Sequence, residues 1–400
     1  MHFLFVKESL VWPRSSGHDV HAYHMMRSLA ALGHEVSLTT RIEPSTEALA
    51  GLTLTTQRGW TAPSPLSGVP LSRLQERFRS YWGIEAESIA AIAQQASECA
   101  ADVVVAVGLE VLPLLAGVRR ARRVWYAADE WVWHHLSLVR FAQPGTWGHV
   151  RTALIKGLYE FAFRTAVDRA WVVSAADRRA LRLCAQIKHV DVIPNGVDTD
   201  HYAPRIGEET PCSCVFWGRL DFEPNIQALE WFSRVVWPGV RKRVPTAQFR
   251  IFGFQPTTAM LDLASLPGIT VTPDVHDLRG EIARSQVVVL PFQSGGGVKN
   301  KLLEAAAMAK PIVCSSRARN GLTPGSERSL ASAHSAAQWV DTLAELWGSK
   351  RRRDELGNAA RSWVMNSHSW ESSAQQAVRP LETAMQSSRR GAGQGALSHA

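Results

Sequence analysis

The stretch that decides the fold is SGGGVKNKLLEAAAMAKPIV, residues 294–313. An apolar strand ends just before it at Leu290-Pro291, three glycines follow, and then a helix begins. Glycines let backbone N–H groups approach an anion, and a helix N-terminus adds about half a positive charge. Lys299 and Lys301 add full charges, so the stretch has the composition of a phosphate cradle, although it is neither a Walker A sequence nor G-x-G-x-x-G. The alternative is a flexible strand–helix loop with solvated lysines.

Glu304 favours the phosphate-cradle interpretation. It lies in LLEAAAM, residues 302–308, which is typical of a packed helix. A carboxylate there must reach water or find hydrogen-bond donors, because burying it unpaired costs several kcal/mol or more. The hydroxyls of a nucleotide sugar are suitable donors. A surface glutamate on the outer side of the helix is the alternative.

A second candidate site follows the strand predicted at 215–217. The sequence continues Gly218-Arg219-Leu220-Asp221, so Arg219 stands at the carboxyl end of that strand. Ligands of open α/β sheets bind at this edge, and a guanidinium there can neutralise a diphosphate. The alternative is a structural ion pair with Asp221 or Glu223.

Apolar runs alternate with helical stretches along both halves of the chain, at 3–6, 103–107, 124–126, 171–173, 215–217, 249–252, 269–271, 287–290 and 312–314. Such runs indicate parallel sheets covered by helices on both faces. The segment DVIPNGVD, residues 191–198, separates the halves, because Pro194 excludes helix and Asn195-Gly196 favours a turn. Residues 56–83 are rich in proline and glycine, which predicts an insertion or a mobile loop.

The composition is that of a soluble globular protein of 400 residues, with 46% hydrophobic and 20% charged residues, so two domains are expected. The formal net charge of +8 favours anionic partners, but the basic residues are scattered and no nucleic-acid motif occurs. The five cysteines fit no zinc spacing and predict reduced cytoplasmic thiols. No run is long enough for a signal-peptide core or a membrane span.

Four sequence landmarks occur in order: GHEV at 33–36, VIPNGVD at 192–198, FWGRL at 216–220 and KLLEAAAMAKPIV at 301–313. The last of these contains LEA at 303–305 and closes with KPIV at 310–313. On these the chain resembles the family 4 glycosyltransferases, retaining enzymes of the GT-B fold, over nearly its whole length. GRLDFEPN at 218–225, with GVKNK at 297–301, is similar to a branch of bacterial sugar transferases linked to exopolysaccharide and surface-glycan assembly.

The resemblance implies an α/β fold of two Rossmann-like, doubly wound domains that face a cleft. We expect an acceptor-side domain at 1–200, a nucleotide-sugar domain at 201–369, a helix crossing back at 370–387 and a disordered tail at 388–400. Arg219 and a lysine of 299–301 would stabilise the leaving diphosphate, and Glu304 would hold the ribose. No cofactor or metal is expected, since no Asp-x-Asp pair is placed to bridge the phosphates.

The chain departs from the family pattern at two positions. The family carries two glutamates eight positions apart, and the first of them falls on Gly296 here. The family lysine beyond Gly-Arg-Leu falls on Pro224. Positive charge for the diphosphate must then come from Arg219 together with Lys299 or Lys301.

In the N-terminal half, the loop at Gly17, His18 and Asp19 corresponds to the place where such enzymes approach the donor phosphates and the acceptor. His18 and Asp19 can equally cap the next helix. Asp129 follows the strand at 124–126, at a place that resembles the one where family members keep a polar group facing the acceptor, and it is preferred to Glu130 for that role. Ser174 is expected to cap a helix through Asp177.

Aromatic and basic residues mix at 60–83 and 119–164, which predicts a membrane-facing surface on the N-terminal domain. Its candidates are Trp60, Arg77, Phe78, Arg79, Tyr81, Trp82, Arg119 to Arg123, Trp125, Trp131, Trp133, His134, His135, Arg140 and Trp147. The alternative is that these side chains pack inside the domain.

The predicted protein is a retaining glycosyltransferase (EC 2.4) of bacterial surface-glycan or exopolysaccharide synthesis. Its expected partners are a nucleotide-sugar donor and a glycan or lipid-linked acceptor, but no nucleic acid. It would act in the cytoplasm, or at the inner face of the cytoplasmic membrane. The candidate residues are Arg219, Lys299, Lys301 and Asp129 for catalysis; Gly17, Gly218, Gly295, Gly296, Gly297 and Glu304 for donor binding; and His18, Asp19 and Glu130 on the acceptor side. A GT-B-type nucleotide-sugar epimerase and a non-catalytic nucleotide-sugar-binding protein remain alternatives.

Overall fold

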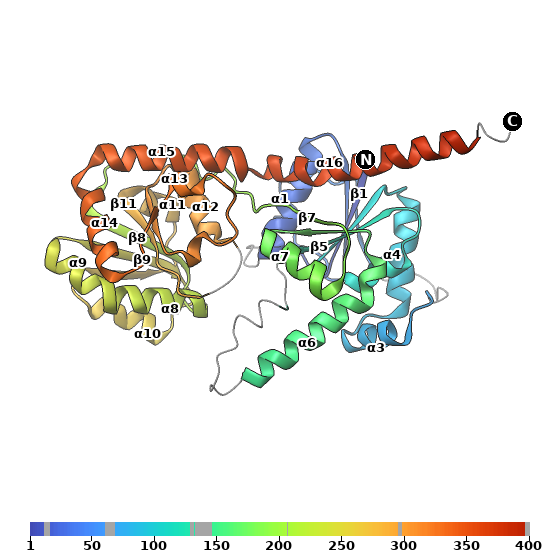
Figure 1. Ribbon diagram of the computed structural model, residues 1–400, viewed down its shortest axis with the longest axis horizontal. Coiled ribbons are helices and arrows are strands. Elements are labelled where there is room, and N and C mark those ends of the chain that lie inside the picture. The colour runs from blue at the N-terminus through green and yellow to red at the C-terminus, as the bar shows by residue number, and fades with distance from the viewer. Residues whose placement is uncertain are drawn as a thin grey trace. The chain divides into compact units, whose positions relative to one another are not determined.

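The computed structural model describes residues 1–11, 17–60, 69–128, 132, 146–205, 207–294 and 298–396. The chain forms two compact units, one of Met1–Ile193 with Trp370–Ala400 and one of Pro194–Ser369 (Figure 1). We call them unit 1 and unit 2. Each is built around a parallel sheet with helices on both faces, which confirms the predicted class of two Rossmann-like domains.

Unit 1 contains a seven-stranded parallel sheet in the order β3-β2-β1-β4-β5-β6-β7. The strands are β1 His2–Lys7, β2 Glu35–Thr40, β3 Thr56–Gly59, β4 Val103–Val107, β5 Arg122–Ala128, β6 Arg169–Val172 and β7 Val190–Val192. Every residue of β1 and β4 is buried, as expected for central strands covered on both faces. The chain order reverses between β1 and β4, which makes the carboxyl ends of these strands a switch point where ligands of such folds bind.

The helices and short helical turns of unit 1 are α1 Gly17–Ala31, α2 Thr46–Leu49, α3 Arg73–Tyr81, α4 Ala86–Glu98, η1 Leu112–Gly117, α6 Thr146–Phe163, η2 Arg164–Ala166, α7 Ala175–Ala180, η3 Leu181–Ala185 and α16 Trp370–Ala396. Side chains of β1 point alternately to the two faces. Phe3 and Phe5 pack in the cluster beneath α1 and α16, whereas Leu4 and Val6 pack in the cluster beneath α4 and α6. The last helix of the chain is therefore part of the core of the first unit.

The structure changes two expectations about unit 1. The region 56–83 holds strand β3 and helix α3, which begins with a capping box of Ser72 and Gln75, while 61–68 lies outside the described residues. Helix α16 continues to Ala396, so the predicted helix end at 387, with a disordered tail from 388, was too early. The glycines of the tail suggested that end, but the helix includes them.

Ser174 caps α7, as predicted, by accepting from the Asp177 amide at 3.2 Å.

Unit 2 contains a six-stranded parallel sheet in the order β10-β9-β8-β11-β12-β13. The strands are β8 Thr210–Arg219, β9 Gln248–Phe254, β10 Ile269–Pro273, β11 Ser285–Leu290, β12 Ile312–Cys314 and β13 Ala331–Ser332. The helical elements are α8 Glu223–Trp231, η4 Phe232–Val236, α9 Trp237–Arg243, α10 Thr258–Leu261, η5 Asp262–Ser265, α11 Leu278–Arg284, α12 Asn300–Ala307, η6 Arg317–Arg319, α13 Ser326–Ser329, α14 Ala336–Gly348 and α15 Lys350–Ser367. The strand order reverses between β8 and β11, so the second switch point lies at the carboxyl ends of these two strands. Gly218 and Arg219 end β8, and the glycine-rich stretch follows β11 in sequence.

His368 fixes the end of α15 to the start of unit 2. Its Nδ1 lies 2.8 Å from the carbonyl oxygen of Asn195, and its Nε2 lies 2.9 Å from the hydroxyl of Thr323. A carbonyl can only accept, so Nδ1 carries the proton and Nε2 accepts from the threonine. The Val197 amide also donates to the His368 carbonyl at 2.8 Å. The turn predicted at Asn195-Gly196 is not formed: residues 193–196 have no regular or turn structure, and Gly196 is not among the residues with positive φ. The segment is instead held by a neutral, buried imidazole.

We expect unit 2 to lose stability on acidification through His368. Burial lowers the pKa of this histidine to about 4, so it is neutral in the folded unit while the unfolded chain takes up a proton near pH 6.5. Its contribution is present above pH 6.5 and falls by about 1.4 kcal/mol for each pH unit between 6.5 and 4. Urea unfolding of unit 2 at pH 7 and pH 5 measures this loss. The variant His368→Gln should have a lower free energy of unfolding than wild type at pH 7, but this free energy should fall by about 2 kcal/mol less than that of wild type on going to pH 5. An equal fall in both proteins would contradict the role assigned to His368.

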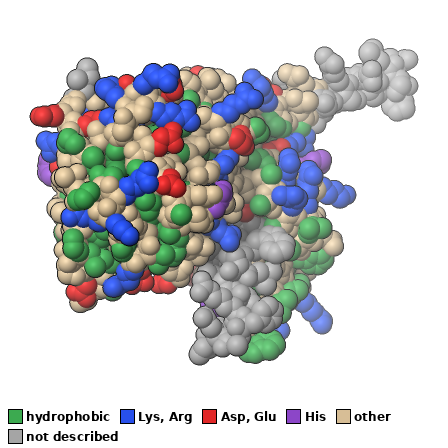
Figure 2. Space-filling model, turned by 60° about the vertical axis from the view of Figure 1, so that its left-hand side comes forward, with side chains coloured by type: hydrophobic (Ala, Val, Ile, Leu, Met, Phe, Trp, Pro, Cys, Tyr) green, Lys and Arg blue, Asp and Glu red, His purple; other side chains and the backbone are tan. Residues whose placement is uncertain are grey.

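All five cysteines are free thiols. In the part of the chain that the structure describes, no helix combines the length and the apolar composition needed to cross a membrane. Lys and Arg side chains are spread over the visible face in Figure 2 and do not gather into one strip.

Candidate active site

The carboxyl end of β8 lies directly against a lysine of α12. Gly218 has φ of +138°, and a β-carbon there would lie 3.3 Å from Cε of Lys301 and 3.2 Å from Nδ2 of Asn225. Any larger residue would therefore be strained in its backbone and would push against Lys301. The glycine predicted for donor binding has a structural reason: it lets Lys301 approach the strand end.

Lys301 is enclosed at the switch point of unit 2. Its Nζ lies 3.4 Å from Oδ1 of Asn225 and about 5 Å above the rings of Phe216 and Phe292. Burial lowers the pKa of Lys301, and the nearby carboxylate of Glu304 opposes that shift. An ammonium group in such a site lacks most of its hydration, so an anion that replaces the lost water is bound strongly.

Glu304 stands one helical turn beyond Lys301 and has two donors from its own unit. Nε1 of Trp217 donates to its Oε2 at 2.8 Å, and the hydroxyl of Tyr202 also hydrogen-bonds to the carboxylate. Burial raises the pKa of Glu304, whereas these hydrogen bonds and Lys301 lower it. The sequence argument required donors for this carboxylate, and the chain supplies two. A carboxylate has about four acceptor positions, so two remain for a further ligand.

Arg219 forms an ion pair with Asp221, which was the alternative interpretation of this residue. Its Nη2 lies 2.7 Å from Oδ2 of Asp221 and its Nε lies 3.0 Å from Oδ1, with 44% of the arginine side chain exposed. An exposed pair of this kind contributes little to stability and can exchange for another anion. Arg219 thus lies at the predicted strand end, but it is a weaker candidate than Lys301.

The remaining donor-side candidates border the start of α12. Lys299 occupies the position just before Asn300, with its Nζ 5.2 Å from the ring centre of Phe292. Asn195 donates to the side chain of Asn300 at 3.1 Å, which joins the segment that precedes Val197 to the start of α12. Gly295, Gly296 and Gly297 lie outside the described residues.

In unit 1 the predicted loop residues stand at the start of α1, which begins at Gly17. Asp19 is 3% exposed and its Oδ1 lies 2.7 Å from Nζ of Lys7, at the end of β1. It therefore joins α1 to the sheet and is not available at the surface. Asp129 and Glu130 lie outside the described residues, directly after β5.

Sequence reasoning missed Glu110, which lies at the switch point of unit 1. A β-carbon on Gly108, whose φ is +104°, would lie 2.6 Å from Oε2 of Glu110 and 3.7 Å from Nδ1 of His18. Nε1 of Trp125 holds the Gly108 carbonyl at 2.9 Å. Gly108-Leu109-Glu110 follows the apolar run 103–107, so the strand-end argument that was used for Asp129 would have found Glu110 too. Asn225 was also missed; it follows Pro224 directly and is 2% exposed.

Part of the predicted aromatic surface is core. Trp125 is fully buried and Trp60 is 4% exposed, so neither can contact a membrane. Phe78 and Trp82 pack against buried Tyr159. Trp147 and Tyr81 are 84% and 69% exposed. Trp131, Trp133, His134, His135 and Arg140 lie outside the described residues.

Two family models match the chain in sequence. The model described as Glycosyltransferase Family 4 matches residues 15–201, and that described as Glycosyl transferases group 1 matches residues 211–349. No curated protein sequence matches. The matches fall on the two units that carry the two switch points.

Solved structures of similar fold extend over almost the whole chain. A sucrose-phosphate synthase from Thermosynechococcus elongatus is 15% identical, with 97% of this chain and 100% of that chain covered and a TM-score of 0.67. TarM is 11% identical, with 95% and 99% covered and a TM-score of 0.69. Alr3699/HepE of Anabaena, in complex with UDP and glucose, is 13% identical, with 95% and 99% covered and a TM-score of 0.62. At these identities the likeness concerns the fold. Taken with the two family models, it shows that the chain belongs to the family 4-like glycosyltransferases of the GT-B fold.

Proposed function

We propose that the protein transfers a sugar from a nucleoside diphosphate sugar to a hydroxyl of a glycan or lipid-linked glycan. The observation that carries the proposal is the placement of Lys301 and Glu304 on consecutive turns of α12, at the carboxyl end of β8. A nucleoside diphosphate needs a cation beside its diphosphate and a hydrogen-bond acceptor beside its ribose hydroxyls. Lys301 and Glu304 of this helix supply these two groups. Retention of the anomeric configuration and a role in bacterial surface-glycan or exopolysaccharide synthesis rest on the family resemblance.

In this mechanism Lys301 stabilises the negative charge that grows on the diphosphate as the sugar leaves. Lys299 adds charge beside it, and Arg219 contributes when it exchanges Asp221 for the phosphates. Charge stabilisation of this kind is usually the largest catalytic contribution, and losing one group typically costs about 10²–10³ in rate. Since protein cations fill this role, we propose that the reaction needs no metal.

The decisive experiment incubates the purified protein with a panel of nucleoside diphosphate sugars, with and without saccharide acceptors, in the presence of EDTA. UDP-sugars come first, because Alr3699/HepE, which shares the fold, was solved with UDP. Acceptor-dependent release of the nucleoside diphosphate supports the proposal, and proton NMR of the product gives the anomeric outcome. Turnover without acceptor would indicate an epimerase. Nucleotide binding without any turnover would indicate a non-catalytic binding protein, and a requirement for magnesium or manganese would exclude the metal-free mechanism.

Glu304→Gln should weaken nucleoside diphosphate binding about 10- to 100-fold, because a hydrogen bond to a charged group contributes about 1.5–3 kcal/mol. Glutamine keeps an oxygen for Trp217 but removes the charge that a ribose hydroxyl prefers. Calorimetry with UDP and with its 2′,3′-dideoxy analogue separates this effect from changes at Lys301. The analogue lacks the ribose hydroxyls and should bind wild type and variant alike. If the variant loses as much affinity for the analogue as for UDP, Glu304 does not hold the ribose. Glu327→Gln, at an exposed position, is the matched control.

The proposed contact with a membrane is now confined to the exposed surface of α3 and α6, which pack against each other in unit 1. Trp147, Arg151, Leu154 and Leu158 recur at helical spacing along α6, and all are exposed. Arg77 and Tyr81 are exposed on α3. An apolar stripe with basic residues beside it is typical of helices that lie on anionic lipid.

We expect the protein to sediment with vesicles that contain anionic lipid, and less so at high salt, since each basic residue near the surface adds about 1 kcal/mol. Replacing both Trp147 and Leu158 by serine should weaken this binding tenfold or more, because each large apolar side chain contributes about 1.5–3 kcal/mol when buried. Leu183→Ser, at a site 73% exposed elsewhere in unit 1, is the control. A double variant that binds like wild type would remove α6 from the contact.

A further inference from the structure

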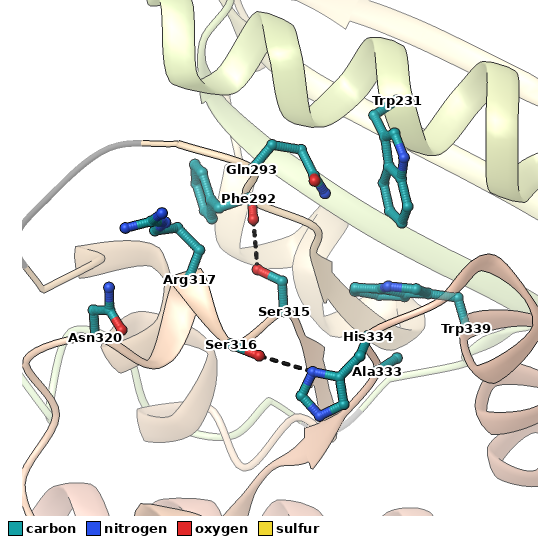
Figure 3. A pocket seen from close by; sticks show the side chains of 10 residues that line it. All are labelled: Trp231, Phe292, Gln293, Ser315, Ser316, Arg317, Asn320, Ala333, His334 and Trp339. Carbon is teal, nitrogen blue, oxygen red and sulfur yellow. Dashed lines mark hydrogen bonds between the residues drawn. The ribbon is translucent and has the colours of Figure 1, made fainter. Parts of the chain in front are cut away.

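A pocket in unit 2 lies beside the Lys301–Glu304 site and is separate from it. The cavity has a volume of about 430 Å³ and opens at the carboxyl ends of β11, β12 and β13 (Figure 3). Its walls are Trp231, Phe292, Gln293, Ser315, Ser316, Arg317, Asn320, Ala333, His334 and Trp339. Neither Lys301 nor Glu304 lines it, and Phe292 is the wall that faces Lys301. This edge of a parallel sheet is where ligands bind in such folds.

The bottom and one side of the pocket are preformed. Phe292, Ser315 and Ala333 are buried, and the hydroxyl of Ser315 donates to the Phe292 carbonyl at 2.7 Å, which ties the end of β12 to that of β11. Trp231 extends from α8 toward fully buried Trp339, with ring centres 6.5 Å apart at 70° (Figure 3). Trp339 holds the partly exposed Trp231 ring in position. A ligand therefore meets an ordered aromatic surface, which lowers the entropy cost of binding.

The rim of the pocket is polar and carries no carboxylate. Gln293, Ser316, Arg317, Asn320 and His334 are exposed there and come from the ends of three neighbouring strands. The hydroxyl of Ser316 lies 2.7 Å from Nδ1 of His334, and this hydrogen bond holds both side chains in position. Among the residues that the structure describes, no acidic side chain forms a salt bridge with Arg317. The guanidinium at this rim can thus pair with an anionic group of a ligand.

We propose that this pocket binds a pyranose ring that carries a carboxylate or a phosphate, as part of the acceptor. A pyranose has an apolar C–H face, which suits Trp231, and an edge of hydroxyl groups, which suits the amides and hydroxyls of the rim. Arg317 selects the acidic substituent. The volume is at the lower end for ligand pockets, so it fits one or two sugar rings and not a long chain. That the saccharide is the acceptor rests on the proposed function; the binding of an acidic sugar does not.

The two sources of negative charge, a uronic acid and a sugar phosphate, are compared in one experiment. Saturation-transfer NMR measures binding of glucuronate, glucose 6-phosphate, glucose and inorganic phosphate to the whole protein. We expect both acidic sugars to bind at least tenfold more tightly than glucose, and inorganic phosphate to bind more weakly than glucose 6-phosphate. Arg317→Gln should remove the preference for acidic sugars, and Trp231→Ala should weaken every sugar. Arg328→Gln, an exposed arginine of the same unit outside the pocket, should bind like wild type.

Three outcomes would overturn the proposal: no sugar binding by wild type, equal binding of glucose and glucuronate, or equal behaviour of the Arg317 and Arg328 variants. UDP affinity, measured on the same samples, should not change in either pocket variant, so a failure here leaves the nucleotide site standing. Conversely, a protein that binds acidic sugars but no nucleotide would contradict the proposed function alone. With an acceptor that ends in a uronate, Arg317→Gln should raise KM for the acceptor at least tenfold and leave KM for the donor unchanged.

Discussion

Lys301→Met should lower turnover about 10²–10³-fold, the largest loss that we expect from any single substitution. Methionine has a similar length and is apolar, so the contacts with Phe216 and Phe292 are kept while the charge is lost. The charge matters most in the transition state, when the diphosphate becomes more negative, so kcat should fall more than nucleotide affinity. Steady-state kinetics together with calorimetric affinities for the nucleoside diphosphate measure both quantities.

The pH profile gives an independent check on Lys301. Since burial lowers the pKa of this lysine, its charge is lost at a lower pH than that of an ordinary lysine, and kcat/KM should decline on the alkaline side accordingly. In the variant Lys301→Arg the side chain keeps its charge throughout this range, so kcat/KM should no longer decline on the alkaline side, whatever the absolute rate of the variant. Arg219→Ala should cost less than Lys301→Met, because Arg219 is exposed and already paired with Asp221. Lys242→Met, an exposed lysine on α9, is the control; a Lys301→Met rate within a few-fold of this control would exclude Lys301 from catalysis.

Truncation after Ser369 should unfold unit 1 while unit 2 stays folded. The removed helix contributes Ala374, Ala377, Val378 and Leu381 to the core under α1. Trp370 stacks on His24, with ring centres 5.0 Å apart and 3° between planes. At about 1.5–3 kcal/mol for each large buried side chain, the loss approaches the whole stability of an ordinary domain, about 5–15 kcal/mol.

Hydrogen exchange followed by mass spectrometry tests this truncation segment by segment. Amides of β1, β4 and α1 should lose protection, and those of β8, β9 and β11 should keep it. A peptide of residues 370–396 added in trans should restore protection in unit 1. A chain ending at Gln386 keeps every α16 residue of the core cluster and should behave like the full chain. Retained protection of β1 in the shorter chain would show that unit 1 folds without its last helix.

Much of the fold was predictable because its central strands are apolar on both faces. The runs 103–107 and 287–290 became β4 and β11, which are buried almost throughout. β3 was missed because Thr56–Gly59 has no buried residue and no apolar run. α3 was missed because it is short and polar overall, although Leu74 and Phe78 stand at helical spacing and Phe78 packs against the core. The predicted end of the last helix was wrong because glycines were read as ending it, whereas α16 continues to Ala396.

The candidate site was predictable in its position and only partly in its chemistry. Strand ends and the helix start can be inferred from short-range patterns, so Gly218, Lys301 and Glu304 could be named as candidates from the sequence. The donors of Glu304 are Trp217 and Tyr202, which lie far away in sequence and meet it only through tertiary packing. Trp60 and Trp125 show the converse problem: an aromatic residue in a basic segment does not reveal whether it is buried.

The place of α16 in unit 1 also constrains when the protein can fold during its synthesis. Most of unit 1 precedes unit 2 in the sequence, yet the helix that completes its core is translated after all of unit 2. At about 5–20 residues per second, the ribosome needs on the order of ten seconds or more to make the intervening residues. During that interval the core cluster of Met25, Met26 and Leu29 lacks the residues that α16 supplies. We therefore expect the nascent chain to bind chaperones until α16 has left the ribosome.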